Sequence, residues 1–144
     1  MQSFKDNQGA TWSIEITVTT VKRLKNELDL DLMKIAEPDS DLLDRLAGDP
    51  ILLVDALWVI CRDNATITDE EFGQRMGGES IDNAVMALME AIADFFPRAR
   101  REILRKMIAK ARQAEETVLS RVSEKMDSGE IESEVERQLN EHGL

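Results

Sequence analysis

One stretch of the chain, near its start, alternates hydrophobic and polar residues. A period of two is typical of a strand with one buried face. Turn-forming residues at positions 6–9 follow Phe4, so we expect a β-hairpin over about residues 3–18 with a short first strand. Two strands alone are marginally stable in water, and the hairpin must therefore pack on other elements. The alternating apolar residues are Trp12, Ile14, Ile16 and Val18.

After residue 19 the apolar positions recur every three or four residues, which is typical of amphipathic helices. Residues that cap helices precede the first three of these segments, and Asp49 followed by Pro50 is the clearest start signal. Pro38 and Gly48 interrupt the pattern. The sequence therefore predicts three helices in this half. They run from Thr19 or Thr20 to Leu28, from Asp41 to Ala47 after Ser40, and from Ile51 to Asn64.

The second half of the chain is predicted to be helical throughout. Thr68 and Glu71 have the spacing of a capping box, which opens a short helix that ends near residues 77–78. A longer helix follows over residues 79–96, and Pro97 ends it. The pattern then continues without a break to Asp127, with apolar residues about 3.7 positions apart. That spacing fits a straight helix better than the 3.5-residue repeat of a left-handed coiled coil.

These elements predict a mainly α fold, close to the α+β class, in which a short N-terminal hairpin packs on a multi-helix bundle with one long C-terminal helix. A chain of 144 residues is about the size of one domain. We expect a single domain over residues 1–127 and an acidic tail at 128–144 that is either a weak helix or unstructured. Aromatic residues make up only 4% of the chain, so the core must be aliphatic.

The net charge of −11 is distributed unevenly along the sequence. Residues 97–112 carry seven basic and one acidic side chain, whereas residues 113–144 carry three basic and nine acidic ones. An acidic surface repels nucleic-acid backbones and membrane headgroups, so neither is an expected partner. The basic cluster lacks interleaved aromatic residues, which favours protein contacts or internal salt bridges over nucleic-acid binding. Its members are Arg98, Arg100, Arg101, Arg105, Lys106, Lys110 and Arg112.

Residues suited to catalysis or metal binding are scarce. The one histidine, His142, lies near the end of the chain, and the one cysteine, Cys61, lies in an apolar segment and is expected to be buried. Paired acidic residues lack the spacing of a calcium loop, and the glycines at 73–78 lack that of a phosphate loop. We therefore expect no catalytic, cofactor-binding or metal-binding site, and a protein that is not an enzyme.

The candidates for partner binding are apolar and basic residues of the later helices. Methionine side chains adapt to varied apolar surfaces, so Met86 and Met89 are candidates to line a groove between helices 51–64 and 81–96. Core packing is the other interpretation of both methionines and the favoured one, and the same holds for Trp58, which lies inside the most apolar helix. We expect Trp12 to anchor the hairpin to the helices. The basic candidates for partner contact are Arg98, Arg101 and Arg105.

A longer pattern extends over residues 4–112 and consists of structural motifs rather than catalytic ones. Its members are Phe4, Asp6, Gly9, Trp12, Ile14, Ile16, Thr17 and Val18, then residues 22–25, residues 49–57, Phe72, and Asp94 to Pro97 before the basic helix. This pattern resembles small tail assembly chaperones of tailed bacteriophages and prophages. Residues beyond Arg112 have no counterpart in the resemblance.

The resemblance implies a non-enzymatic protein of the bacterial host cytoplasm. Proteins of this family bind the tape measure protein and promote assembly of tail tube subunits around it, and they are absent from the mature virion. The partners implied are therefore the tape measure protein and the tail tube protein, with a homo-oligomer also open. Two other interpretations stay open: a tail-completion or connector protein, and a small DNA-associated regulator that uses the basic cluster.

Overall fold

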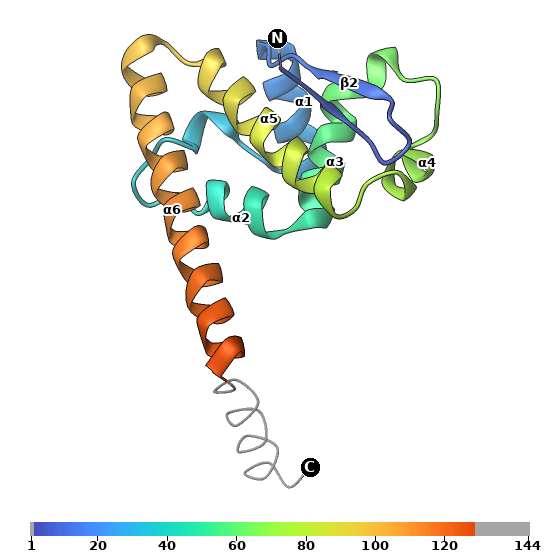
Figure 1. The fold of residues 1–144 in the computed structure, drawn as a ribbon. Coiled ribbons are helices and arrows are strands. Elements are labelled where there is room, and N and C mark those ends of the chain that lie inside the picture. Colours follow the sequence, from blue (N-terminus) through green and yellow to red (C-terminus); the bar gives the residue numbers. More distant parts are fainter. Residues whose placement is uncertain (1, 129–144) are drawn as a thin grey trace, which may run out of the picture. The chain divides into compact units, whose positions relative to one another are not determined.

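The computed structural model describes residues 2–128 and has the predicted mainly α architecture (Figure 1). The expectations for His142 and for the acidic tail after Ser128 lie outside the described residues. The strands are β1 (Gln2–Lys5) and β2 (Thr11–Ile14), and the helices are α1 (Val18–Leu28), η1 (Leu32–Lys34), α2 (Leu42–Gly48), α3 (Pro50–Cys61), η2 (Arg62–Asn64), α4 (Asp69–Gln74), α5 (Glu79–Phe95) and α6 (Arg98–Ser128).

The hairpin forms as predicted but ends earlier. The strands pair antiparallel, with Phe4 opposite Trp12 and Gln2 opposite Ile14. The expectation of a strand as far as Val18 is wrong: β2 ends at Ile14, which pairs with Gln2, and Val18 is the first residue of α1. The Thr17 hydroxyl accepts a hydrogen bond from the Thr20 backbone N–H, and this cap starts α1 at Val18, slightly before the predicted position.

Contacts divide the chain into two units, residues 1–106 and residues 107–144. This division differs from the expected single domain over residues 1–127. It falls within α6, a helix of 31 residues.

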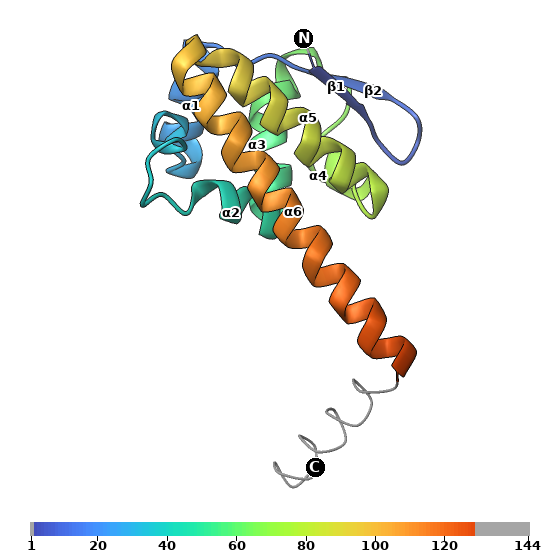
Figure 2. The same ribbon diagram turned by 60° about the vertical axis from the view of Figure 1, so that its left-hand side comes forward.

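In the first unit, β1 lies along α5, β2 contacts α3, and α3 also packs against α1 and α2 (Figures 1 and 2). The inner face of the hairpin buries Phe4 and Ile14. Burial of each large apolar side chain contributes about 1.5–3 kcal/mol. The core is mainly aliphatic, as the composition predicts. Its fully buried large side chains are Ile14, Leu24, Leu30, Leu32, Ile35, Leu46, Leu53, Leu57, Phe72, Leu88, Ile92 and Phe96.

Two helices, α3 and α4, start at their predicted capping residues. The carboxylate of Asp49 accepts hydrogen bonds from the backbone N–H groups of Ile51 and Leu52, with Pro50 at the first helical position of α3. The Thr68 hydroxyl accepts from the backbone N–H of Glu71 at the start of α4. Within residues 2–128, none of the helices combines the length and the apolar character needed to cross a bilayer.

Phe72 joins three elements of the first unit. Its side chain has no exposed surface, and its ring lies 4.7 Å from that of Trp12 on β2 and 5.6 Å from that of Trp58 on α3. We expect Phe72→Ala to lower the free energy of unfolding by about 3–5 kcal/mol, because it removes a large side chain and leaves a cavity. Urea denaturation followed by circular dichroism measures this loss.

The matched control is Ile51→Ala, since Ile51 is 76% exposed on α3. This substitution should change the free energy of unfolding by no more than about 0.5 kcal/mol. Equal effects of the two substitutions would contradict a central role for Phe72.

Candidate partner-binding surface

A buried carboxylate fixes the turn of the hairpin. Asp6 is 5% exposed, and one of its oxygens accepts hydrogen bonds from the backbone N–H groups of Gln8 and Ala10 at 2.9 and 3.0 Å. The other oxygen accepts from the indole N–H of Trp12 at 2.9 Å and from the guanidinium of Arg75 at 3.5 Å. Four donors from the turn, β2 and the end of α4 therefore meet at one side chain.

Two further contacts hold the hairpin to the segment after α4. The backbone N–H of Asn7 donates to the carbonyl of Arg75 at 2.9 Å, and Trp12 meets Phe72 edge to face. Trp12 thus anchors the hairpin, as the sequence predicts. Gly9, in the turn, has φ of +81°, a conformation that favours glycine. The N-terminal part of the family-like pattern is therefore explained by the folding of the hairpin.

Hydrogen bonding outweighs burial in setting the ionisation of Asp6. Burial alone would raise the pKa of this carboxyl. The donors from Trp12, Gln8, Ala10 and Arg75 stabilise the charged form, and together they place the pKa below its ordinary value of 3.8. The carboxylate is thus the form that the folded hairpin requires.

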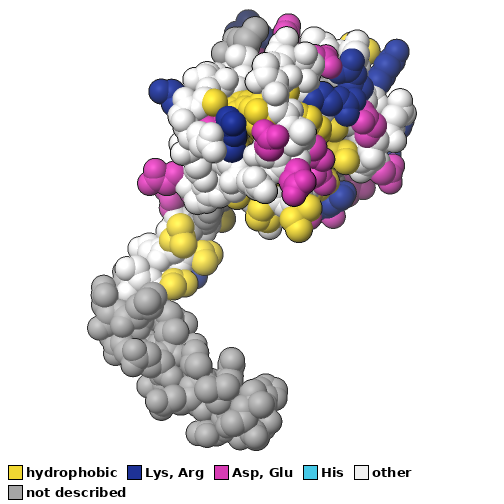
Figure 3. Space-filling model, turned by 90° about the vertical axis from the view of Figure 1, so that its right-hand side faces the viewer, with side chains coloured by type: hydrophobic (Ala, Val, Ile, Leu, Met, Phe, Trp, Pro, Cys, Tyr) yellow, Lys and Arg dark blue, Asp and Glu magenta, His cyan; other side chains and the backbone are white. Residues whose placement is uncertain are grey.

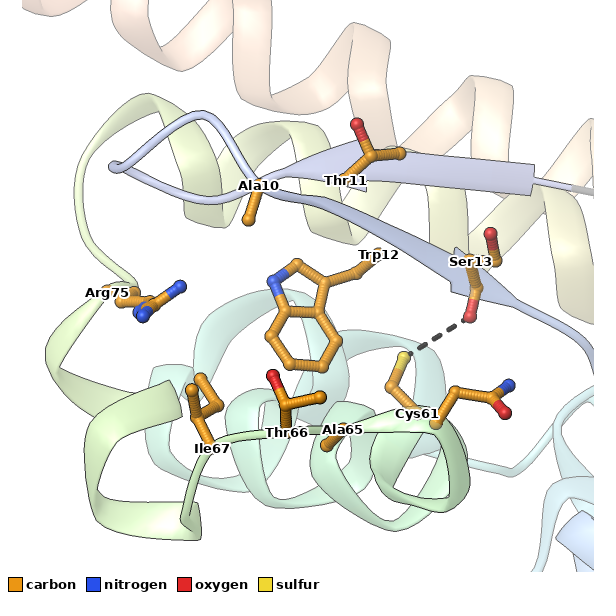
Figure 4. A pocket seen from close by; sticks show the side chains of 10 residues that line it. Ala10, Thr11, Trp12, Ser13, Cys61, Ala65, Thr66, Ile67 and Arg75 are labelled. Carbon is orange, nitrogen blue, oxygen red and sulfur yellow. Dashed lines mark hydrogen bonds between the residues drawn. The ribbon is translucent and has the colours of Figure 1, made fainter.

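A cavity of about 250 Å³ lies between β2 and the segment that follows α3 (Figure 4). The thiol of Cys61 borders it and donates to the backbone carbonyl of Ser13 at 3.4 Å. Burial raises the pKa of Cys61 to about 12, so the thiol stays protonated and unreactive at neutral pH. The lining residues are Ala10, Thr11, Trp12, Ser13, Cys61, Asn64, Ala65, Thr66, Ile67 and Arg75.

The chemistry of this cavity is limited. The Arg75 guanidinium faces the Asp6 carboxylate, and the neutral Cys61 thiol is a poor nucleophile. Among residues 2–128, no group of three or more His, Cys, Asp or Glu side chains is placed to hold a metal ion. The cavity therefore offers no catalytic pair or metal set, and we place the candidate functional surface elsewhere, on α5.

An ion-pair cluster joins α5 to the first turns of α6. The Arg105 guanidinium lies 3.6 Å from a carboxylate oxygen of Glu90 and 3.2 Å from one of Asp94. Arg101 donates to the backbone carbonyl of Asp94 at 3.2 Å. Met86 is 45% exposed one turn before Glu90 on α5. We call these five residues the α5 surface; it combines one accessible apolar side chain with a group of paired charges.

The sequence-predicted candidates divide between this surface and other parts of the first unit. Met86, Arg101 and Arg105 belong to the α5 surface. Met89 is only 4% exposed, so the expectation that it lines an open groove does not hold. The two methionines are three positions apart, about 60° around α5, and Met89 is the one on the side of the buried Leu88 and Ile92. Trp58 is half-buried against Phe72, which favours its core interpretation.

The remaining basic candidate, Arg98, is exposed and forms an ion pair with Glu102 on its own helix at 3.6 Å. Arg98 and Arg105 thus form ion pairs within the first unit, whereas Arg101 donates to a backbone carbonyl. Sequence reasoning missed Glu90 and Asp94. The signal was available, since Met86, Glu90 and Asp94 recur every four residues along one predicted helix.

Comparison of the chain with protein-family models, curated proteins and solved structures gave no match.

The depressed pKa of Asp6 predicts a pH dependence of stability. The pKa of Asp6 is lower in the folded protein than in the unfolded chain, so the charged carboxylate stabilises the fold. This contribution is present above about pH 3.8 and is lost as the pH falls through the pKa of the folded state. At pH 7, Asp6→Asn should lower the free energy of unfolding by about 1.5–3 kcal/mol. Urea titrations at a series of pH values should show the difference from the wild type shrinking below about pH 4.

Asp39→Asn is the matched control, because Asp39 is exposed and its loss should leave stability nearly unchanged at every pH. A difference between the wild type and Asp6→Asn that stays constant down to pH 2 would argue against this account of Asp6.

Burial of Cys61 predicts slow thiol chemistry. At pH 8 a thiol with a pKa of about 12 has on the order of a thousandfold less thiolate than one at the ordinary value of 9.0. Labelling of the native protein with a maleimide, followed by mass spectrometry, should be at least about 100-fold slower than labelling in urea. Equal rates in the two conditions would show that the thiol is accessible in the folded state.

Proposed function

We propose that this protein is a non-enzymatic tail assembly chaperone of a phage or prophage. In this proposal it binds the tape measure protein in the cytoplasm of the bacterial host and promotes assembly of the tail tube. The observation that carries the proposal is the family-like pattern of residues 4–112. Its motifs fall on the hairpin, on α1, on α3, on Phe72 of α4 and on the junction of α5 with α6.

The charge of the protein supports a solubilising role. A long helical client must have its apolar stripes covered until tube subunits enclose it. A partner with a net charge of −11 would keep the complex dispersed by repulsion between copies. The helical composition of the chain also suits packing against a client helix.

The α5 surface supports a specific docking point. Met86 offers an adaptable apolar contact for a hydrophobic client side chain. The neighbouring carboxylates, Glu90 and Asp94, are partly exposed although both pair with Arg105. They can therefore orient basic residues that flank the apolar stripe of the client. Figure 3 shows one face of the molecule, on which apolar side chains reach the surface in small groups among charged ones.

We expect Met86→Asp to abolish the complex with the tape measure protein. A charge at this position cannot be buried against an apolar client side chain without a large desolvation cost. The test is co-expression of the two proteins, with co-elution and mass followed by size-exclusion chromatography with light scattering. The wild type should keep the client soluble and co-elute with it, and the variant should bind it at least about tenfold more weakly.

Ile51→Asp provides the matched control, since it also places a charge on an exposed apolar residue, on α3 instead of α5. It should leave the complex intact. Circular dichroism must show that both variants are folded. Two results together would contradict the chaperone proposal: the wild-type protein does not bind the client, and mass spectrometry detects the wild-type protein in purified virions. They would indicate a structural tail component instead.

A further inference from the structure

The outer edge of β2 carries unpaired backbone groups. Along an antiparallel pair, residues that exchange hydrogen bonds alternate with residues whose N–H and C=O groups point away from the other strand. The backbone N–H of Asp6 donates to the Ala10 carbonyl, so this alternation turns the backbone groups of Thr11 and Ser13 outward. The Cys61 thiol donates to the Ser13 carbonyl. Within residues 2–128, the other N–H and C=O groups of this edge have no partner.

The cavity of about 250 Å³ opens beside this edge. It lies between β2 and residues 64–67, and Figure 4 shows the Trp12 side chain pointing into it from β2, with Ile67 on the other side. Ala65, in the opposite wall, is extended, with φ of −78° and ψ of 140°. One wall of the cavity is therefore an unpaired strand edge, and the other is an extended segment of the chain.

We propose that this edge binds an extended peptide segment of a partner protein, which adds to β2 as a third strand and carries an acidic side chain. Extended peptides add to exposed sheet edges through backbone hydrogen bonds, while neighbouring pockets select their side chains. The added strand bonds to the outward backbone groups of Thr11 and Ser13. Neither residue belongs to the α5 surface, so this site goes beyond the proposed function and does not depend on it.

The charge of the cavity favours an acidic side chain. On the added strand, the residues opposite Ala10 and Trp12 point to the same face as these two and enter the cavity. Arg75 is the one charged residue among those that line it. One nitrogen of its guanidinium contacts Asp6, at 3.5 Å, so the other N–H groups can donate to a carboxylate of the peptide. Charges elsewhere on the acidic surface are screened beyond about 8 Å in physiological salt.

Both walls of the cavity are held by contacts within the protein. On the side of β2, the indole of Trp12 donates to Asp6 and meets Phe72 edge to face. The opposite wall follows η2, where the Arg62 guanidinium donates two hydrogen bonds to the Glu27 carboxylate, at 2.6 and 2.7 Å. Because the site is already ordered, a short peptide loses little binding energy to ordering the protein.

Amide hydrogen exchange measured by NMR tests the geometry of the edge. In the free protein, the amides of Thr11 and Ser13 should exchange at least about tenfold faster than that of Trp12, which bonds to β1. Bound peptide should slow the exchange of Thr11 and Ser13 and leave Trp12 unchanged. Equal protection of all three amides in the free protein would overturn the proposal. Protection that rises with protein concentration would do so too, because it would assign the edge to a second copy of the chain.

The probe is a blocked peptide of about eight residues that alternates threonine and valine, with glutamate at one valine position. Its affinity, measured from NMR shifts of the full chain, should be at least about fivefold higher than that of the same peptide with lysine in place of glutamate. No binding at about 1 mM peptide, or tighter binding of the lysine peptide, would contradict the proposal.

N-methylation of the peptide separates strand addition from binding of the side chain alone. Two versions of the glutamate peptide are compared, one methylated at the threonines and the other at the alternate residues. Each is blocked along one edge, and only one edge of the peptide can bond to β2. Their affinities should therefore differ at least about tenfold. Equal affinities would show that no third strand forms.

Ser13→Pro tests the edge from the side of the protein. Proline lacks the N–H group and is tolerated in a strand where that group faces away from the neighbouring strand. This substitution should weaken binding of the glutamate peptide at least about tenfold. Ser13→Ala is the matched control, since it keeps the backbone donor and should bind as the wild type does. Circular dichroism must show that both variants are folded, and a folded Ser13→Pro variant with unchanged affinity would refute the proposal. If this variant does not fold, the methylated peptides decide.

Discussion

The first unit depends on the burial of one carboxylate. A charged group is costly to remove from water unless donors replace its hydration, and Asp6 receives four of them. Two come from the turn, which they close, and the others come from Trp12 and Arg75. The same interaction that shapes the turn therefore also attaches the hairpin to the end of α4.

This attachment explains how so short a sheet is stable. Strands of four residues bury little surface on their own. Here Trp12 donates to Asp6 on one side and packs against Phe72 on another, while β1 lies along α5. The hairpin thus gains most of its stability from helices that follow it in the sequence, and α5 is held in place by the same contacts.

Local signals in the sequence predicted the fold well where one residue decides the outcome. Asp49 before Pro50, Thr68, and Pro97 at the end of α5 each mark a helix boundary close to its observed place. The end of β2 was not predicted in this way, because the alternating pattern continues to Val18, whereas the capping of α1 by Thr17 already starts a helix at that residue. The local cap and the alternation compete over these residues, and the cap decided the boundary.

The candidate surface shows the same contrast between local and tertiary information. Met86 and Met89 belong to one apolar segment, and periodicity alone did not tell which of them faces the core. The ion pairs of Arg105 with Glu90 and Asp94 join segments whose contact depends on the turn at Pro97. Because these pairs are partly exposed, each contributes little to stability. A side-chain arrangement that adds little to folding can change its partners at low cost, and this property makes the α5 surface a better candidate for transient recognition than the tightly bonded carboxylate of Asp6.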